Sequence, residues 1–591
     1  MAVGAGPETA DTELPTSTPD RSPGFTVERG VEVPMRDGVR LSANVFRPSP
    51  APPGPGPAIL IRQPYGKDEH PTMWARGKYW ARKGYACAIQ DVRGKFASEG
   101  RWQPVVHEAA DGWDTLDWVA AQPWCDGNIG MAGESYHGIT QWAVAALGHP
   151  NLRCIAPGNA TPDPYSMTYR GGAFVLPMAL WTSVMEGRGI ADPSGFDPWH
   201  LPLATMDTAM GLPSTAFQDL LAHPTRDAFW ARADARRAPA AVRIPVFHWG
   251  GWYDVLLHGT LAGWYGAAAG RPAEPRCGDQ WLVIGPTDHT LTPAAYGRGA
   301  AAEGSAGAWS FDRLQRFFDH YLRGEDDAFR ESPRVSVYVM GAERWRDADT
   351  WPLPEARPRV YYLHGAGAAN TAAGDGSLSS RVPGGEPVDR FAYDPRDPVD
   401  TWLGESLWDL SWALRDRSEV ERRGDVLVYT SEPLAGELEV TGPLTMTLYA
   451  SSSAASTDFC AALVDVFPDG SAHLVQEGIV RAGAGDGRGP ALPLAPGAVA
   501  EYRIDLAATS YLFGPGHRLR LEVSSSIFGR YDRNLNTGRP AAHDVGGEVA
   551  RQQVHHSRVY PSQITLPIVP AEAAPDAGPV GASRRATDRR H

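Results

Sequence analysis

Several features that define large classes of protein are missing from this sequence. It contains no apolar run of about 18 residues, so no segment is predicted to cross a bilayer as a helix. The net charge is −14, whereas nucleic acids and anionic membrane surfaces attract concentrated positive charge, so we expect neither as a partner. There is no H-E-x-x-H motif and no C-x-x-C pair. The sequence therefore predicts no metal site and no cofactor.

Cysteine is also scarce, with five residues that are widely spaced and odd in number. This pattern does not indicate a disulfide framework, and a reducing cytoplasm is the expected location. Residues 1–24 lack a basic stretch followed by an apolar one, so we expect no Sec signal there. They are rich in Pro, Thr, Gly and acidic residues, which is typical of a disordered tail, and residues 571–591 have a similar character.

What the chain does contain is enough apolar and aromatic material for two or three domains, with 42% hydrophobic residues and 20 tryptophans in 591 residues. Residues 25–159 and 244–325 alternate strand-like and helical segments, which predicts a mostly parallel sheet covered on both faces. Between them, residues 160–243 read as a helical insertion. Residues 330–570 carry many short strand-like runs separated by turn residues, typical of an antiparallel sandwich or jelly roll.

The predicted elements of the first part are the following. We expect strands at Val33–Val45, Pro57–Arg62, Tyr85–Gln90, Arg153–Ala156 and Trp281–Ile284, and helices at Trp74–Lys83, Ala109–Ala121, Phe174–Glu186, Pro213–Leu221 and Phe311–Leu322. In the last part, the first of the strand-like runs is Val335–Val339.

The most informative stretch is residues 129–141, where an apolar run reaches Ser135 and an amphipathic segment follows. A serine held between glycines at a strand-to-helix turn is how α/β folds present a nucleophile at the carboxyl edge of a sheet. Here the second glycine comes one position late, at Gly138. Without further support, such a serine is more often a turn or capping residue.

That support comes from two later strand ends. A serine nucleophile needs a histidine base, and the histidine needs a carboxylate to orient it. Asp254 follows the strand-like segment at 245–248, and His289 follows the next strand, Trp281–Ile284, so the chain order is Ser, Asp, His. Asp288 is a rival carboxylate and His137 a rival base. We assign His137 to the rim of the pocket or a supporting position, because it lies two residues after the serine.

An oxyanion hole needs two hydrogen-bond donors. The backbone N–H of Tyr136, next to the nucleophile, is the first candidate. The phenol of Tyr65 is the second, because its loop follows an early strand and can reach the same edge of the sheet.

Together these motifs resemble those of the CocE/NonD hydrolases, a family that includes cocaine esterase, X-Pro dipeptidyl-peptidases, glutaryl-cephalosporin acylases and α-amino-acid ester hydrolases. The resemblance spans roughly residues 28–570. It is carried by the loop of Tyr65, by residues 91–94 and 97–100, by the turn from Gly133 to Gly138, and by the segments ending at Asp254 and His289.

The resemblance implies an α/β-hydrolase domain with a helical cap at 160–243, followed by an all-β C-terminal jelly-roll domain. It implies that Ser135, Asp254 and His289 form a catalytic triad, with Tyr65 and Tyr136 in the oxyanion hole. By rough alignment, the acyl pocket falls at apolar residues and at neighbouring aromatic or rim positions. These pocket candidates are Met167, Trp181, Leu256, Trp142, Trp252, Tyr169 and His137.

We therefore expect a serine hydrolase that cleaves an ester or amide bond of a small molecule through an acyl-enzyme, with a carboxylesterase as the first choice. The alternatives are an X-Pro dipeptidyl-peptidase, a β-lactam side-chain acylase or a biosynthetic acyltransferase. A peptidase would need acidic groups for the peptide N-terminus, for which Glu186 and Asp192 are weak candidates. A catalytically inactive binding protein is the remaining class. A homodimer is retained as the assembly to be tested.

Overall fold

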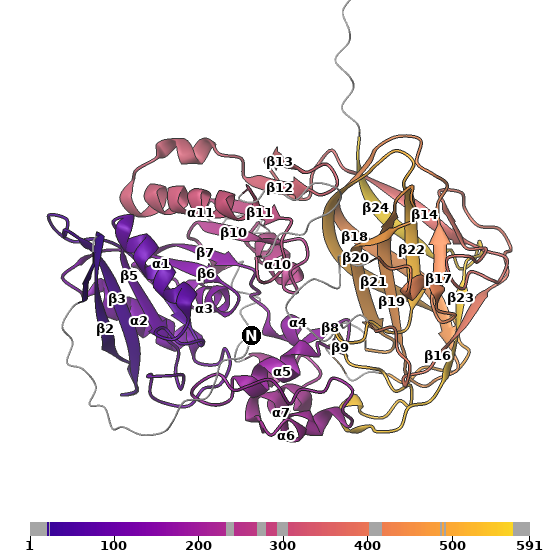
Figure 1. The fold of residues 1–591 in the computed structure, drawn as a ribbon, viewed down its shortest axis with the longest axis horizontal. Coiled ribbons are helices and arrows are strands. Elements are labelled where there is room, and N and C mark those ends of the chain that lie inside the picture. The colour runs from indigo at the N-terminus through magenta and orange to yellow at the C-terminus, as the bar shows by residue number, and fades with distance from the viewer. Residues whose placement is uncertain are drawn as a thin grey trace, which may run out of the picture.

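The computed structural model of the chain describes residues 20–22, 24–231, 241–268, 279–291, 305–400, 416–484, 487, 489 and 492–570. Figure 1 shows an α/β part and a part built of strands side by side, with a small helical part beside the junction between them. Most of the two predicted tails, and residues 232–240 of the predicted cap, lie outside the described residues. Among the described helices, none combines the length and the apolar character that crossing a bilayer requires.

The α/β part is organised around one mixed sheet with the strand order β1-β2-β3-β5-β4-β6-β7-β10-β11-β12-β13. The strands from β5 to β12 in this order are parallel, and the strands at the two edges are antiparallel. The strands are β1 Asp20–Ser22, β2 Gly24–Pro34, β3 Arg40–Ser49, β4 Gly56–Gln63, β5 Ala86–Asp91, β6 Cys125–Glu134, β7 Leu152–Gly158, β10 Val246–Gly251, β11 Gln280–Gly285, β12 Val335–Val339 and β13 Arg344–Ala348.

Helices cover both faces of this sheet, as the alternating pattern predicts. The apolar sides of α1 and α11 pack on one face, and those of α2 and α3 pack on the other. The helices of this part are α1 Pro71–Arg82, α2 Glu108–Ala120, α3 Tyr136–Ala145, α10 Leu257–Ala268 and α11 Ser305–Phe318, which continues into η2 Asp319–Arg323 and is followed by η3 Asp327–Glu331. The mostly parallel, doubly covered sheet is therefore confirmed.

Three predictions about this sheet were wrong in detail. The strand expected at Val33–Val45 is a hairpin of β2 and β3, because Asp37 and Gly38 form a turn in which Gly38 has φ +87. Strand β1 lies within residues 1–24, which were expected to be a tail, and pairs with β2. Strand β12, expected to belong to the C-terminal part, instead pairs parallel with β11 and extends the first sheet.

The helical part follows β7. It contains α4 Pro164–Thr168, β8 Tyr169–Arg170, β9 Ala173–Phe174, α5 Pro177–Val184, η1 Leu203–Thr205, α6 Met206–Ala209, α7 Thr215–Ala222 and α8 Ala228–Ala231. The helix expected at Phe174–Glu186 is shorter because Gly171 and Gly172, both at positive φ, turn the chain into the small β8–β9 hairpin first.

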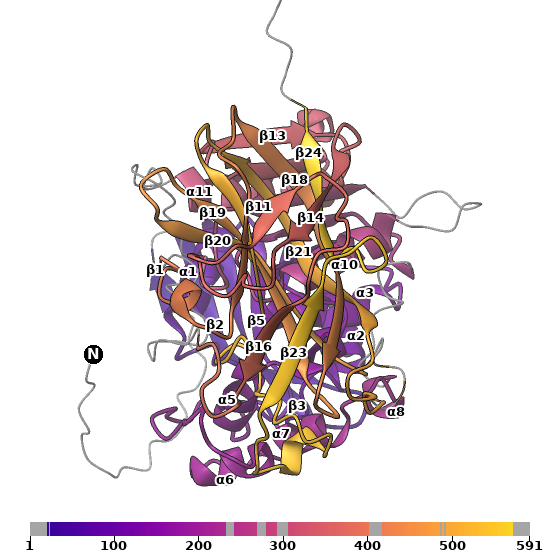
Figure 2. The ribbon, with the colours of Figure 1, turned by 90° about the vertical axis from the view of Figure 1, so that its right-hand side faces the viewer.

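The C-terminal part consists mainly of strands (Figure 2). Its pairings are antiparallel except that between β15 and β17. The strands are β14 Arg357–His364, β15 Ser377–Ser379, β16 Asp389–Tyr393, β17 Leu427–Thr430, β18 Leu438–Ser452, β19 Asp458–Val466, β20 Ala472–Arg481, β21 Ala500–Phe513, β22 Arg518–Ser524, β23 Ala550–His555 and β24 Gln563–Val569, with the short turns η4 Val420–Arg422 and η5 Ala541–His543.

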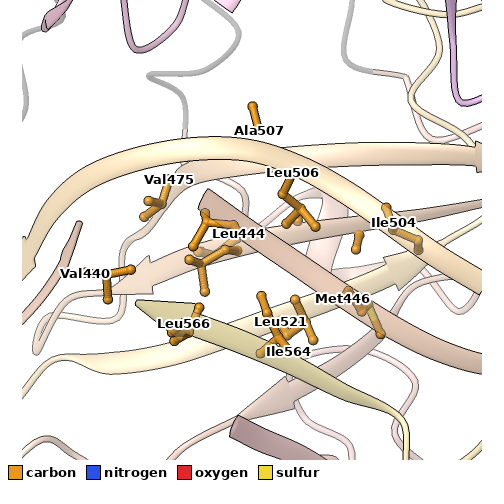
Figure 3. Close-up of a cluster of buried hydrophobic side chains, with 14 of the residues drawn as sticks. Val440, Leu444, Met446, Val475, Ile504, Leu506, Ala507, Leu521, Ile564 and Leu566 are labelled. Atoms are coloured by element: carbon orange, nitrogen blue, oxygen red, sulfur yellow. The ribbon is translucent and has the colours of Figure 1, made fainter. Parts of the chain in front are cut away.

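Alternate residues of these strands point inward and form one apolar core (Figure 3). Residues of the α/β part join the same cluster, among them Trp252, whose indole donates a hydrogen bond to the carbonyl of Tyr338 at 2.8 Å. The carbonyl of Trp252 accepts a hydrogen bond from the Gln476 side chain of β20 at 2.7 Å. The C-terminal part is thus packed directly against the loop that follows β10.

Candidate active site

Ser135 lies at a strained turn between β6 and α3. Its backbone has φ 59 and ψ −129, a conformation that non-glycine residues rarely adopt. A Cβ atom on Gly133 would lie 2.6 Å from the Cβ of His137, and one on Gly138 would lie 2.4 Å from the Cβ of Ala160. Both positions therefore require glycine, which explains why the second glycine stands at 138.

The structure brings together the serine, aspartate and histidine expected from the strand ends. Nε2 of His289 is 3.0 Å from Oγ of Ser135, and Nδ1 of His289 is 2.6 Å from Oδ1 of Asp254. Oδ1 of Asp254 also accepts a hydrogen bond from the backbone N–H of Leu256 at 3.1 Å. This is the hydrogen-bonded chain that a serine nucleophile, its base and an orienting acid require.

Asp254, and not the rival Asp288, contacts the imidazole. The carboxylate of Asp288 accepts a hydrogen bond from the hydroxyl of Thr290 at 2.7 Å. Burial alone would lower the pKa of His289. The charge and hydrogen bond of Asp254 outweigh burial, so the pKa is raised above 6.5. Asp254 therefore stabilises the imidazolium that forms when His289 accepts a proton.

Tyr65 faces the nucleophile. Burial raises the pKa of its phenol above 10.0, and the nearby side chains of Ser135 and Trp181 lower it to a smaller extent. The hydroxyl consequently stays protonated at neutral pH and can donate a hydrogen bond. The backbone N–H of Tyr136 begins helix α3, where no intrahelical acceptor exists for it, so it is also available to a developing negative charge.

The side chain of Tyr136 is held away from this site. Its hydroxyl donates to Oε1 of Glu108 at 2.9 Å and accepts from the backbone N–H of Val105 at 2.9 Å. The buried phenol therefore fixes the first residue of α3, which in turn fixes the direction of its N–H.

His137 and Glu134 surround Tyr65 without touching the reacting atoms. Nδ1 of His137 donates to the carbonyl of Glu134, and its ring centroid lies 5.6 Å from that of Tyr65. Burial lowers the pKa of His137 to about 4, so the ring is neutral and serves to support Tyr65. Burial raises the pKa of Glu134, but its ion pair with Arg76 outweighs this and lowers the pKa to about 2.

A cavity of about 220 Å³ begins beside Trp181. The indole packs against the rings of Tyr136 and Trp102 at centroid distances of 5.9 Å and 5.6 Å, and Tyr65 packs against the same cluster. The apolar and aromatic residues of the lining include Trp102, Met167, Met178, Trp181, Leu220, Phe229 and Trp230. The cavity can accept an aromatic or branched aliphatic group.

Of the residues proposed for the acyl pocket, Met167 and Trp181 line this cavity and the others do not. The assignment of Trp142 to the pocket was wrong, because this residue lies two helical turns beyond Ser135, packs beside His248 in the core and is 1% exposed. Trp252 was also wrong, because it joins the core shared with the C-terminal part. Tyr169 lines a different cavity, between the helical part and the C-terminal part.

Leu256 and His137 also stand outside the lining of the cavity. Leu256 is buried and contributes its backbone N–H to Asp254. The residues that sequence reasoning missed, such as Trp102 and Trp230, come from loops and a short helix with no distinctive pattern. The positions of such residues depend on how the helical part is held against the α/β part. Lys95, fully buried, donates to the carbonyls of three of its residues, Met185, Gly187 and Gly189, at 2.9, 2.6 and 3.0 Å.

The two acidic candidates for a peptide N-terminus do not form a pair. Oε2 of Glu186 accepts hydrogen bonds from Ser214 and from the backbone N–H of Ala216, in the first turn of helix α7, at 3.0 Å and 3.1 Å. Asp192 is exposed and bonds to Ser194 in its own loop. Glu186 does line the cavity, together with Asp219, which the sequence did not single out.

Comparison with known proteins gives matches over nearly the whole chain. The model of the X-Pro dipeptidyl-peptidase (S15 family) matches residues 37–291, and that of the X-Pro dipeptidyl-peptidase C-terminal non-catalytic domain matches residues 327–565. The cocaine esterase of Rhodococcus sp. (strain MB1 Bresler) is 38% identical over 580 residues, which cover 92% of this chain and 99% of that protein.

Two solved structures are similar along their whole length. An aminopeptidase from a marine sediment Thaumarchaeota archaeon has a TM-score of 0.82 at 27% identity, covering 95% of this chain and 99% of that one. An α-amino acid ester hydrolase also has a TM-score of 0.82, at 26% identity, covering 95% and 100%.

Proposed function

Because the chain belongs to the CocE/NonD family of serine hydrolases, in which the X-Pro dipeptidyl-peptidases (S15) are included, we propose that it is a carboxylesterase with Ser135 as the nucleophile. The observation that carries this proposal is the unbroken hydrogen-bonded chain from Oγ of Ser135 through His289 to Asp254. A buried carboxylate on one side of the imidazole and a hydroxyl on the other are what acyl transfer requires.

The reaction follows from this geometry. Oγ of Ser135 attacks the carbonyl carbon of the ester while Nε2 of His289 takes the hydroxyl proton. The carbonyl oxygen becomes an oxyanion that accepts hydrogen bonds from the phenol of Tyr65 and the N–H of Tyr136. His289 then gives its proton to the leaving alcohol as the ester C–O bond breaks. Water, deprotonated by His289, then attacks the acyl carbon, and the bond to Oγ of Ser135 breaks as His289 returns the proton to Oγ, which releases the acid.

The acyl group is proposed to occupy the cavity beside Trp181, with Met167 on its wall. The support is the position of Trp181, which packs in the same apolar cluster as Tyr65 and also lines the cavity. The predominantly apolar lining favours an aromatic or branched acyl group over a charged one. Transfer of the acyl group to an amine or alcohol uses the same intermediate and stays open as an alternative outcome.

A second candidate, an aminopeptidase of the X-Pro type, is favoured by a single observation. Glu186 and Asp219 both line the cavity, and two carboxylates could bind the ammonium group of a peptide. Glu186, however, already accepts two hydrogen bonds from the start of α7. The esterase therefore stands first.

The decisive experiment compares the protein with Ser135→Ala after exposure to a fluorophosphonate, using intact mass and hydrolysis of p-nitrophenyl butyrate and Gly-Pro-p-nitroanilide. We expect one adduct, lost in Ser135→Ala together with about 10⁴-fold or more of the turnover. Ser183→Ala, which removes another buried hydroxyl, is the matched control and should keep both. Full turnover in a folded Ser135→Ala would refute the mechanism, and preference for the anilide would favour the peptidase.

We also propose a jelly-roll arrangement for the C-terminal strands, supported by their antiparallel pairing around one apolar core. The proposed domains are the α/β-hydrolase domain, the helical cap and the C-terminal domain. We propose for them the boundaries expected from the sequence, except that β1, β12 and β13 belong to the first sheet. A cytoplasmic location is supported by four cysteines that are buried and free in the described residues, namely Cys87, Cys125, Cys154 and Cys460.

A further inference from the structure

A small cavity is lined by Asp254, the residue that orients the imidazole of His289. Its volume is about 10 Å³, which is room for about one water molecule. The walls come from the loop after β10, from the start of α10 and from the C-terminal part. The lining residues whose polar groups matter here are Asp254, His258, Gln476, Glu477 and Arg530.

Two carboxylates on this cavity each leave one oxygen without a protein partner. Oδ1 of Asp254 is used by His289 and by the N–H of Leu256, whereas Oδ2 is buried and has no hydrogen-bond partner among the described residues. Oε1 of Glu477 accepts from Arg530 at 2.8 Å, whereas Oε2 is likewise buried and unpartnered within the described chain. Both side chains belong to residues that are 3% exposed.

Such oxygens are costly unless something donates to them, because a buried acceptor without a hydrogen bond loses about 1–3 kcal/mol relative to water. A water molecule has two hydrogen atoms to donate. The cavity has room for about one such molecule, and its lining residues Asp254 and Glu477 each carry one unpartnered acceptor oxygen. The positive charge of Arg530 also acts on both Glu477 and Asp254.

We propose that this cavity is a buried-water site, and that Glu477 and Arg530 of the C-terminal part are positioning residues for Asp254. The water donates one hydrogen bond to Oδ2 of Asp254 and one to Oε2 of Glu477. Arg530 holds Glu477 in place from the other side. This proposal rests on the proposed function, since it concerns the residue that orients the catalytic base.

The consequence is that the C-terminal part completes the active site without touching the substrate. The carboxylate of Asp254 would otherwise be free to rotate about its bond to Cβ, since one oxygen carries both known hydrogen bonds. With the bridge in place, rotation breaks a hydrogen bond to a fixed partner on β20. The side chain of Gln476, next to Glu477, already fixes the carbonyl of Trp252 two residues before Asp254.

Other charged groups around this site must be considered in any test that varies pH. The charges of Glu134 and Asp288 also act on His289, and both raise its pKa. On the far wall, His258 faces Asp505 at 3.5 Å and feels the positive charges of Arg170 and Arg530. Burial and these charges lower the pKa of His258 to about 4, so it stays neutral over the working range.

The test removes a negative charge in one variant and a positive charge in another. The pH dependence of kcat/KM is measured with p-nitrophenyl butyrate on the full chain and on Glu477→Gln and Arg530→Met. The acidic limb of this profile is the fall in kcat/KM as His289 becomes protonated. Removing the negative charge of Glu477 should move the acidic limb to lower pH, and removing the positive charge of Arg530 should move it to higher pH. Each shift should be about 0.3 to 1 pH unit, as expected for partly screened charges. Losing the bridge should also lower kcat/KM about 2- to 10-fold.

Glu439→Gln is the matched control, because Glu439 is another buried glutamate of the C-terminal part paired with an arginine, Arg346, at 2.7 Å. It should leave the limb unmoved. Shifts of the same sign in both variants, or no shift in either, would overturn the proposal. If Arg530→Met does not fold, Glu477→Gln alone tests the proposal. This substitution preserves the shape of the side chain and must still move the acidic limb to lower pH.

A crystal structure supplies an independent check. Density for one water within hydrogen-bonding distance of both orphan oxygens is the expected result, and an empty cavity would overturn the bridge. Failure of the proposed function is distinguishable, because it would appear as turnover that survives Ser135→Ala. If the buried-water site is wrong, turnover will still depend on Ser135, but the acidic limb of the pH profile will be the same in the Glu477 and Arg530 variants as in the parent.

Discussion

Replacing Tyr65 by Phe removes one hydroxyl from the proposed oxyanion hole and little else. The ring keeps its contacts with His137 and His70, whose centroids lie 5.6 Å and 6.4 Å from that of Tyr65. The backbone N–H of Tyr65 still bonds to the side chain of Gln63 at 2.6 Å. We therefore expect the variant to fold with little loss of stability, about 1 kcal/mol or less.

The effect on catalysis should be much larger than the effect on folding. A donor aimed at the oxyanion is worth about 2.7–4 kcal/mol in the transition state, which corresponds to about 10²–10³ in kcat. The ground state loses less, because a substrate carbonyl is a weaker acceptor than an oxyanion. The change should consequently appear in kcat more than in KM.

The assay is steady-state hydrolysis of p-nitrophenyl butyrate, with thermal unfolding measured in parallel. Tyr169→Phe is the matched control, because its hydroxyl donates to the carbonyl of Leu220 at 3.0 Å and has no part in the proposed reaction. Since burial raises the pKa of Tyr65, the unmodified protein should show no alkaline limb from this group below about pH 10. A Tyr65→Phe variant with kcat within about threefold of the parent would refute its role as a donor.

Three further outcomes follow from the same geometry. Although burial lowers the pKa of His289, Asp254 raises it above 6.5, so kcat/KM should fall as the pH drops through that raised value. In a pH-rate series, Asp254→Asn should move this fall in kcat/KM to lower pH and reduce kcat by about 10⁴-fold. Gly138→Ala should destabilise the fold by about 1–3 kcal/mol in denaturant unfolding, because the added methyl meets the Cβ of Ala160 and outweighs the gain of up to about 1 kcal/mol in helix propensity. Lys95→Met should raise KM and lower the unfolding midpoint, because three carbonyls of the cap lose their donor, and unchanged values would contradict that anchoring role.

The residues that could be predicted from the sequence are those fixed by local rules. Asp254 and His289 stand just past the ends of consecutive parallel strands, and parallel strands bring such positions to one edge whatever the rest of the chain does. Ser135 is recognisable because its turn forces glycine at fixed positions. Chain order and strand ends together were therefore sufficient to find three residues that are 35 and 154 positions apart.

The cavity wall could not be predicted in the same way. Trp142 and Trp181 are both tryptophans in apolar segments, and only tertiary packing separates the buried one from the one beside the cavity. The strand β12 was misplaced for a related reason: its sequence suits either sheet, and its partner β11 lies 50 residues earlier. Glu477 and Arg530 carry no motif at all, since their relation to Asp254 exists only across the contact between two parts.

Trp181 shows why specificity and rate should not vary independently in this protein. Its indole lines the cavity proposed for the acyl group and also packs in the same apolar cluster as Tyr65. An indole N–H can only donate, so the effect of Trp181 on the pKa of Tyr65 requires the phenol oxygen as acceptor, which leaves the phenol proton directed elsewhere. The direction that remains useful is toward Ser135 and the developing oxyanion. Enlarging the cavity at Trp181 would thus also disturb the orientation of the oxyanion donor, whereas a change at Met167 would alter the cavity alone.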